Sequence, residues 1–102
     1  MTKNNEFTMI DKVIHEPARL MILSYLFVLD SADFVFLMKK TGLTRGNLSS
    51  HLSKLENAKY IEIKKEFIDK IPRTMLSISA TGKEKFILYK EKMIELLEVT
   101  DK

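Results

Sequence analysis

The sequence contains no cysteine, and this absence narrows the chemistry that the chain can carry. Without thiols there can be no disulfide, no thiolate zinc site, no cysteine nucleophile and no thiol redox sensor. Only two histidines are present, His15 and His51, and they lie far apart in the sequence. We therefore expect no metal site and no cofactor.

Long hydrophobic runs are absent as well. The longest apolar stretch, residues 20–29, is interrupted by Ser24 and is too short to cross a bilayer. Residues 1–7 are polar and lack the apolar centre of a signal peptide. These absences predict a cytoplasmic protein that makes no membrane contact.

Common catalytic motifs are also missing. There are no paired carboxylates in a motif, no glycine-rich phosphate loop and no Ser-His-Asp signature, so we do not expect an enzyme. What is present is an ordinary globular composition, with 45% hydrophobic and 30% charged residues among 102. This length predicts a single domain spanning residues 1–102.

Positive charge is concentrated in the middle of the chain. The segment 39–73 holds nine basic residues and four acidic ones, a balance of +5, whereas the whole chain carries +3. A basic segment of this kind is typical of a surface that binds a polyanion, although a solvated surface would carry the same charge. The basic residues are Lys39, Lys40, Arg45, Lys54, Lys59, Lys64, Lys65, Lys70 and Arg73.

The apolar pattern predicts N-terminal and core helices over about residues 8–29. A first helix is expected over about 8–14. A second should run from Pro17 to Leu29, because proline suits the first turn of a helix. This second helix is apolar nearly all round, so we expect it at the centre of the core. Residues 30–33 are expected to form a loop.

A helix-turn-helix is predicted over residues 34–57. Its first helix covers about 34–41 and ends at Gly42, and Thr44 is a good N-cap for the second. Two helices joined by a short turn that contains glycine are the signature of this motif.

The period of the apolar pattern then changes from that of a helix to that of a strand. Alternating residues on either side of a charged loop at 66–72 predict an antiparallel hairpin, or wing, over residues 60–79. A final helix, capped by Ser79, is expected over residues 80–99. The predicted fold is mainly α with a small β-hairpin: a winged helix-turn-helix with extra N- and C-terminal helices.

The second helix of the helix-turn-helix has two unlike faces. Its leucines, spaced i, i+4, i+7, must face the core, whereas the opposite face carries short polar groups and cations and no acid. An ordinary surface helix would be polar too, but it would mix Glu and Lys. The acid-free face suits an approach to base edges and phosphates, and we expect Arg45 and Asn47 to contact bases. The predicted DNA contacts here are Thr44, Arg45, Gly46, Asn47, Ser49, Ser50, Ser53 and Lys54.

The hairpin offers a second set of cations for DNA. Lys64, Lys65, Lys70 and Arg73 are expected to contact the backbone or an adjacent minor groove, where arginine is favoured. A solvated tip is the alternative. We expect His51 to be half-buried and hydrogen-bonded, with a phosphate contact as the second interpretation and a metal ligand as the third.

Three parts of the chain carry a resemblance to a known group. The run 41–56 (TGLTRGNLSSHLSKLE) resembles the recognition region of winged-helix DNA-binding regulators related to the MarR and ArsR families, especially their short members. Residues 72–74 and 78–82 are similar to the wing and to the entry to the last helix, and residues 17–20 extend the similarity. The sequence departs from the pattern of these regulators in two ways. It lacks the Cys or His clusters of the ArsR-type metal sensors, and it has Lys59 where relatives often have glycine.

The resemblance implies a homodimer built from terminal helices, with two recognition helices in successive major grooves and a role as repressor or activator. It also leaves open a small-molecule effector, for which no residues can be named. The apolar residues near both termini would give a second subunit a surface to bury, unless they pack only within the chain. The expected dimer residues are Phe7, Ile10, Ile14, Phe86, Tyr89, Met93, Leu96 and Leu97.

These observations predict a sequence-specific double-stranded DNA-binding transcriptional regulator. One alternative is a winged-helix protein–protein interaction module, since a fold does not fix a function. That alternative predicts apolar or acidic residues on the helix face, which has neither. A non-specific architectural DNA binder is the other alternative, and it would share the charge pattern.

Overall fold

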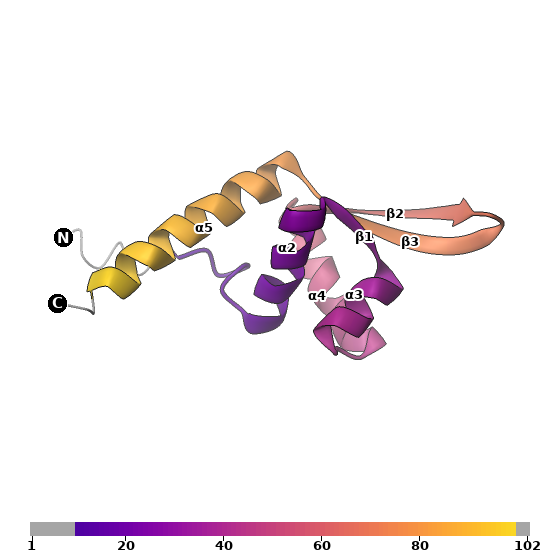
Figure 1. Cartoon of the computed structure of the whole chain (residues 1–102), viewed down its shortest axis with the longest axis horizontal. Helices are drawn as coiled ribbons and strands as arrows, with labels where there is room; N and C mark the ends of the chain where they lie inside the picture. Colours follow the sequence, from indigo (N-terminus) through magenta and orange to yellow (C-terminus); the bar gives the residue numbers. More distant parts are fainter. Residues whose placement is uncertain (1–9, 100–102) are drawn as a thin grey trace.

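The computed structural model describes residues 10–99, which form four helices and a three-stranded antiparallel sheet (Figure 1). Along the chain these elements are α2 (Pro17–Leu29), β1 (Ser31–Asp33), α3 (Phe34–Thr41), α4 (Arg45–Asn57), β2 (Ile61–Ile68), β3 (Ile71–Ile78) and α5 (Ala80–Val99). The strand order is β1-β3-β2. The predicted winged helix-turn-helix fold is confirmed.

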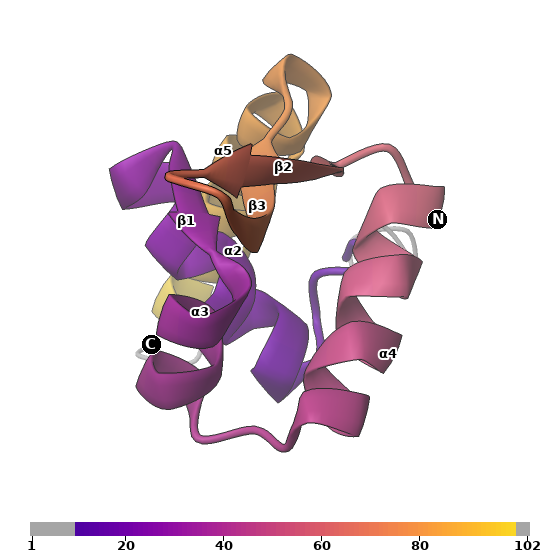
Figure 2. The same cartoon turned by 90° about the vertical axis from the view of Figure 1, so that its right-hand side faces the viewer.

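The molecule is elongated, with extents of 56 × 25 × 21 Å. Helices α2, α3 and α4 form its body, the β2–β3 hairpin projects from one end, and α5 runs in the opposite direction (Figure 1). Seen from the hairpin end, α3 and α4 stand on either side below the wing (Figure 2). The wing and the helix-turn-helix therefore both lie on the side of the molecule that is away from α5.

Helix α2 provides the centre of the core, as its apolar sequence predicts. Its residues Ile22, Leu23 and Leu26 are fully buried, and they belong to the same cluster as Leu37 of α3 and Leu76 of β3. Burying an aliphatic side chain of this size stabilises the fold by about 1.5–3 kcal/mol. The core thus fixes the helix-turn-helix against the base of the sheet.

Each helix begins at a side chain that accepts a hydrogen bond from a backbone N–H three residues later. Thr44 caps α4 at 3.1 Å and Ser79 caps α5 at 2.9 Å, as predicted. Gly42 ends α3 with a φ of 73°, which glycine adopts without strain. The caps of α2 and α3 are Glu16 and Asp33.

The helix expected over 8–14 is wrong in its described part, because residues 10–16 form turns. The carboxylate of Asp11 accepts hydrogen bonds from the N–H groups of Val13 and Ile14, at 2.9 and 3.2 Å. Such a side-chain bond offers the backbone an alternative to a helix. The second oxygen of Asp11 accepts from the Tyr60 hydroxyl, which fastens this segment to the body.

The two loops predicted around the sheet are also wrong. Residues 31–33 form β1, which pairs with β3 and buries Ala32 opposite Leu76. The hairpin strands extend through most of the segment 66–72 and leave a turn of only Asp69 and Lys70. Both turn residues have positive φ, 53° and 68°, as a two-residue turn of this type requires.

Lys59 occupies a position that suits glycine. Its φ is 68°, in the left-handed region, directly after α4. The N–H of Lys59 donates to the carbonyl of Glu56 at 2.9 Å, and that of Tyr60 donates to the carbonyl of Leu55 at 3.0 Å. This pair of bonds is the Schellman motif, so the turn forms here at the cost of a strained lysine.

Candidate nucleic-acid interface

Helix α4 divides into a buried and an exposed face, as its sequence predicts. Leu48, Leu52 and Leu55 are at most 2% exposed and pack into the core. All eight residues predicted to contact DNA on this helix and its cap are exposed, and none of them is acidic. The face therefore offers hydroxyl, amide and cationic groups without a competing carboxylate.

A cleft of about 510 Å³ separates α4 from the wing. From α4 it is lined by Arg45, Ser49 and Ser53, and from the wing by Lys65 and Thr74. The structure thus brings predicted contact residues from two parts of the sequence to one concave surface. Figure 2, seen from the hairpin end, shows α4 beside and below the hairpin.

Two cations of this cleft are held by neighbours. The guanidinium carbon of Arg45 lies 5.2 Å from the ring centroid of Phe34, a cation–π contact. Arg73 also borders the cleft, and its Nη1 donates to Asp33 at 2.9 Å. The N–H of Phe36 first, and then Arg73, hold the pKa of Asp33 below its ordinary value. These contacts fix both arginines near the wall of the cleft.

The remaining wing cations lie in different surroundings. Lys64 forms an ion pair with Glu66 at 3.8 Å and lines a separate hollow, away from the cleft. Lys65 makes no ion pair within residues 10–99. Lys70 is exposed in the turn at the wing tip. Among the four predicted wing contacts, Lys65 is therefore the one most available to a ligand in the cleft.

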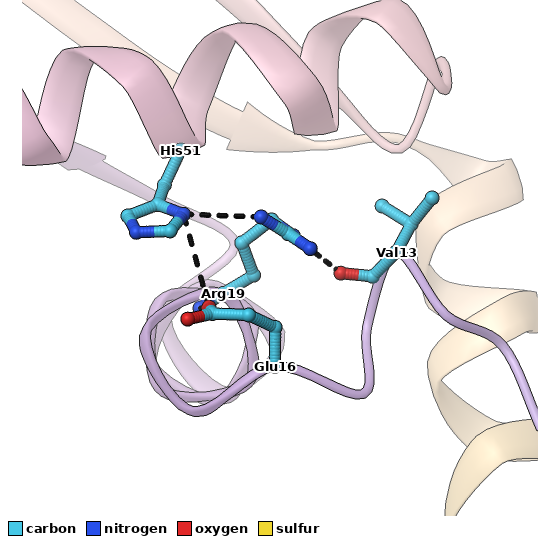
Figure 3. A network of polar contacts seen from close by, with 4 residues as sticks. All are labelled: Val13, Glu16, Arg19 and His51. Carbon is cyan, nitrogen blue, oxygen red and sulfur yellow. Dashed lines mark hydrogen bonds and ion pairs between the residues drawn. The ribbon is translucent and has the colours of Figure 1, made fainter.

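His51 is half-buried and hydrogen-bonded, as predicted (Figure 3). Arg19 Nη1 donates to His51 Nδ1 at 3.1 Å, and Arg19 Nε donates to the Val13 carbonyl at 2.6 Å. Glu16 Oε1 lies 3.7 Å from the same histidine nitrogen. This network ties the middle of α4 to the start of α2 and holds the helix orientation.

Sequence reasoning missed Arg19 and Lys12, which the fold brings to α4. Both line a shallow hollow with Lys54 and Asn57, at the end of the helix away from its cap. Lys12 is exposed there and adds a cation beside Lys54. No local pattern could have indicated this, because the two lysines belong to segments far apart in the sequence.

Two of the expected dimer residues are not surface residues, which corrects that prediction. Ile14 is fully buried in its own chain, and Tyr89 is 8% exposed, with its hydroxyl 2.8 Å from Nδ1 of His15. Burial first, and then the charge of Asp11, raise the pKa of Tyr89.

The other expected dimer residues are distributed differently. Ile10, Phe86, Met93 and Leu96 are partly buried, Leu97 is 61% exposed, and Phe7 lies outside the described residues. Phe86 stacks against Phe27 of α2, with ring centroids 4.9 Å apart. Ile87 and Ile94, which are each 44% exposed, extend the apolar surface along α5.

Two kinds of site are not seen within residues 10–99. No group of three or more His, Asp or Glu side chains there is arranged to hold a metal ion. No helix in the same range is long and apolar enough to cross a membrane.

Comparisons with known proteins agree with the fold. A family model described as a winged helix DNA-binding domain matches residues 18–97. An uncharacterized protein of Methanocaldococcus jannaschii is 34% identical over 89 residues, which cover 87% of this chain and 94% of the relative. A transcriptional regulator homologue protein from Pyrococcus horikoshii has a TM-score of 0.90 at 28% identity, covering 96% of this chain and 99% of that one. The structure of the S. aureus MepR–DNA complex has a TM-score of 0.72 at 16% identity, covering 98% and 82%, a similarity of fold alone.

Proposed function

Because this chain belongs to the family of winged helix DNA-binding domains, we propose that it is a sequence-specific transcriptional regulator that binds double-stranded DNA as a homodimer. The observation that carries the proposal is the exposed, acid-free face of α4 beside the cleft that leads to Lys65. A major groove admits a helix with short polar side chains, because its backbone can then approach the base edges.

In this proposal α4 lies in the major groove with its N-terminal end toward the bases. The carboxamide of Asn47 can pair with adenine through two hydrogen bonds, and the guanidinium of Arg45 can do the same with guanine. Ser49, Ser50 and Ser53 donate to phosphates or bases along the same face. Thr44, as the cap of α4, orients the first turn toward the DNA.

The wing cations supply affinity that does not depend on sequence. Lys65 faces the cleft and neutralises a phosphate, and each neutralised phosphate releases counterions and makes binding sensitive to salt. Lys54, together with Lys12, extends the basic edge at the far end of α4. Lys64, Lys70 and Arg73 add to the positive electrostatic potential around the wing.

The experiment that tests this function is selection from a random-sequence duplex pool at about 150 mM salt, followed by sequencing of the bound DNA. We expect enrichment of a two-fold symmetric motif with half-sites about one helical turn apart. Salt-sensitive binding without any motif would instead support an architectural role. If no duplex binds, the proposed function is wrong and a protein partner becomes the leading hypothesis.

A further inference from the structure

The tip of the β2–β3 hairpin carries large apolar side chains that stay exposed within the described part of the chain. Phe67 keeps 75% of its surface exposed, Ile71 52% and Ile68 43%. They surround the turn at Asp69 and Lys70, at the opposite end of the molecule from α5 (Figure 1). These side chains stand on the strand ends that flank the turn, and their exposure shows that they do not pack into the core of the described residues. An exposed apolar group of this kind indicates contact with another molecule.

The strand register places Phe67 on the cleft side of the wing. Side chains two residues apart on a strand share a face, and Lys65, two residues before Phe67, lines the cleft. The register partner of Phe67 is Pro72, which lines the same cleft. Phe67 therefore continues the surface that begins with Ser49 and Ser53 on α4. A molecule that fills the cleft would therefore contact the aromatic ring of Phe67.

The surroundings of Phe67 favour DNA as that molecule. Lys65 precedes it on the cleft face and Lys70 follows in the turn, and neither forms an ion pair within residues 10–99. Arg73 borders the cleft from the paired strand, where it is paired with Asp33. Cations beside an exposed Phe are the combination found in proteins that insert an apolar wedge from the minor groove and partly unstack a base step. A protein partner would gain the apolar contact but would not require the cations.

Building on the proposed function, we propose that the wing tip is an apolar wedge for DNA. With α4 in the major groove, Phe67 enters the adjacent minor groove and partly unstacks one base step, while Lys65 and Lys70 hold the flanking phosphates. Unstacking bends the duplex and is easiest at flexible pyrimidine–purine steps. The wing therefore adds a sequence preference outside the bases that α4 reads.

The test uses the full chain and a duplex of about 30 base pairs, long enough for two half-sites and their flanks. The duplex carries the selected motif, or a mixed sequence if binding is non-specific, with 2-aminopurine replacing one adenine at each flanking position in turn. We expect the wild type to raise the 2-aminopurine fluorescence at one flanking step. Phe67→Ser should abolish that rise and weaken binding about 10-fold while keeping the core motif, and Phe67→Trp should restore both.

Ile68→Ser is the matched control, because Ile68 is also exposed but alternates to the other face of the strand. It should retain the fluorescence rise of the wild type. Wild-type affinity and fluorescence in Phe67→Ser would overturn the wedge and leave the proposed function standing. Altered self-association with unchanged DNA binding would also overturn it and assign the tip to a protein contact. A wild type that binds no duplex would overturn both proposals.

Discussion

Thr44 and Asn47 lie one turn apart at the start of α4 and have different roles. The Thr44 hydroxyl accepts the N–H of Asn47 at 3.1 Å, so its loss would cost the helix about 1 kcal/mol. The Asn47 side chain is exposed, and alanine has a higher helix propensity than asparagine. A substitution at position 47 can therefore report on DNA recognition without unfolding the helix.

We expect Asn47→Ala to weaken binding to the selected site by about 1–3 kcal/mol and to relax the preference at one base pair. Affinities for a set of single-base variants of the site, measured by fluorescence anisotropy, give both quantities. Lys65→Ala is the control: it should weaken binding to all sequences alike and reduce the salt slope by about one. An unchanged base preference in Asn47→Ala would contradict the assignment of this residue.

Gly46 gives a second prediction at this scale. A Cβ built on it meets no atom within 4 Å, so packing within the chain does not explain a glycine inside a helix. We expect Gly46→Ala to raise the free energy of unfolding by about 0.5–1 kcal/mol, because alanine is the better helix former. DNA affinity should nevertheless fall, because the added methyl group keeps the helix backbone from the bases. Urea denaturation and anisotropy test the two effects separately, and a more stable variant with unchanged affinity would contradict the close approach.

At the scale of elements, local chemistry decided which boundaries could be predicted. Helices α2 and α3 have the predicted bounds. Pro17 begins α2 and Gly42 ends α3, because the backbone preferences of proline and glycine suit these two positions. Strand β1 could not be predicted, since it is stabilised by pairing with β3 more than forty residues later. The candidate site shows the same division: periodicity predicts the face of α4, whereas contacts from Arg19 and Lys12 depend on distant segments.

The strained end of α4 yields a prediction about stability. Left-handed backbone costs an ordinary residue about 1–2 kcal/mol, and glycine avoids this cost but loses more entropy on folding. We expect Lys59→Gly to raise the free energy of unfolding by about 0.5–1 kcal/mol, measured by urea denaturation. Lys59→Ala removes the same charge but keeps the Cβ, so it should not stabilise the protein. Equal stabilisation by both variants would indicate a charge effect instead.

The cap of α3 predicts a dependence of stability on pH. The pKa of Asp33 in the folded protein is lowered by the N–H of Phe36 and by Arg73. Its contribution is therefore fully present above the unfolded-state pKa of about 3.9 and is lost as the pH falls through the lower folded value. Asp33→Asn keeps a capping oxygen but cannot ionise, so it should lose less stability than the wild type between pH 7 and about pH 3. Urea denaturation at the two pH values measures this difference, and identical losses would exclude Asp33 as a source.

At the scale of the whole molecule, the chain is more extended than a compact domain of the same length. The radius of gyration is 15.4 Å, against about 13 Å for a compact domain of this length. The hairpin and α5 extend from the body in opposite directions, and α5 packs on the body through Phe86 and Tyr89 (Figure 1). Ile87 and Ile94 share a face along this helix, since seven residues make about two turns. An exposed apolar row on a projecting helix suits pairing with a second copy.

We expect the wild type to sediment as a dimer of the 11.9 kDa chain, and the double substitution Ile87→Lys with Ile94→Lys to produce a monomer. Both side chains are 44% exposed, so the fold should tolerate lysine at each position, and circular dichroism checks this. Val28→Lys on α2 is the control, because it also replaces an exposed apolar residue with lysine, at a position that is 79% exposed and lies off α5. The monomer should bind a single half-site but lose the tighter binding to the symmetric site, because that binding depends on two linked recognition helices. A double variant that remains dimeric would place the interface elsewhere.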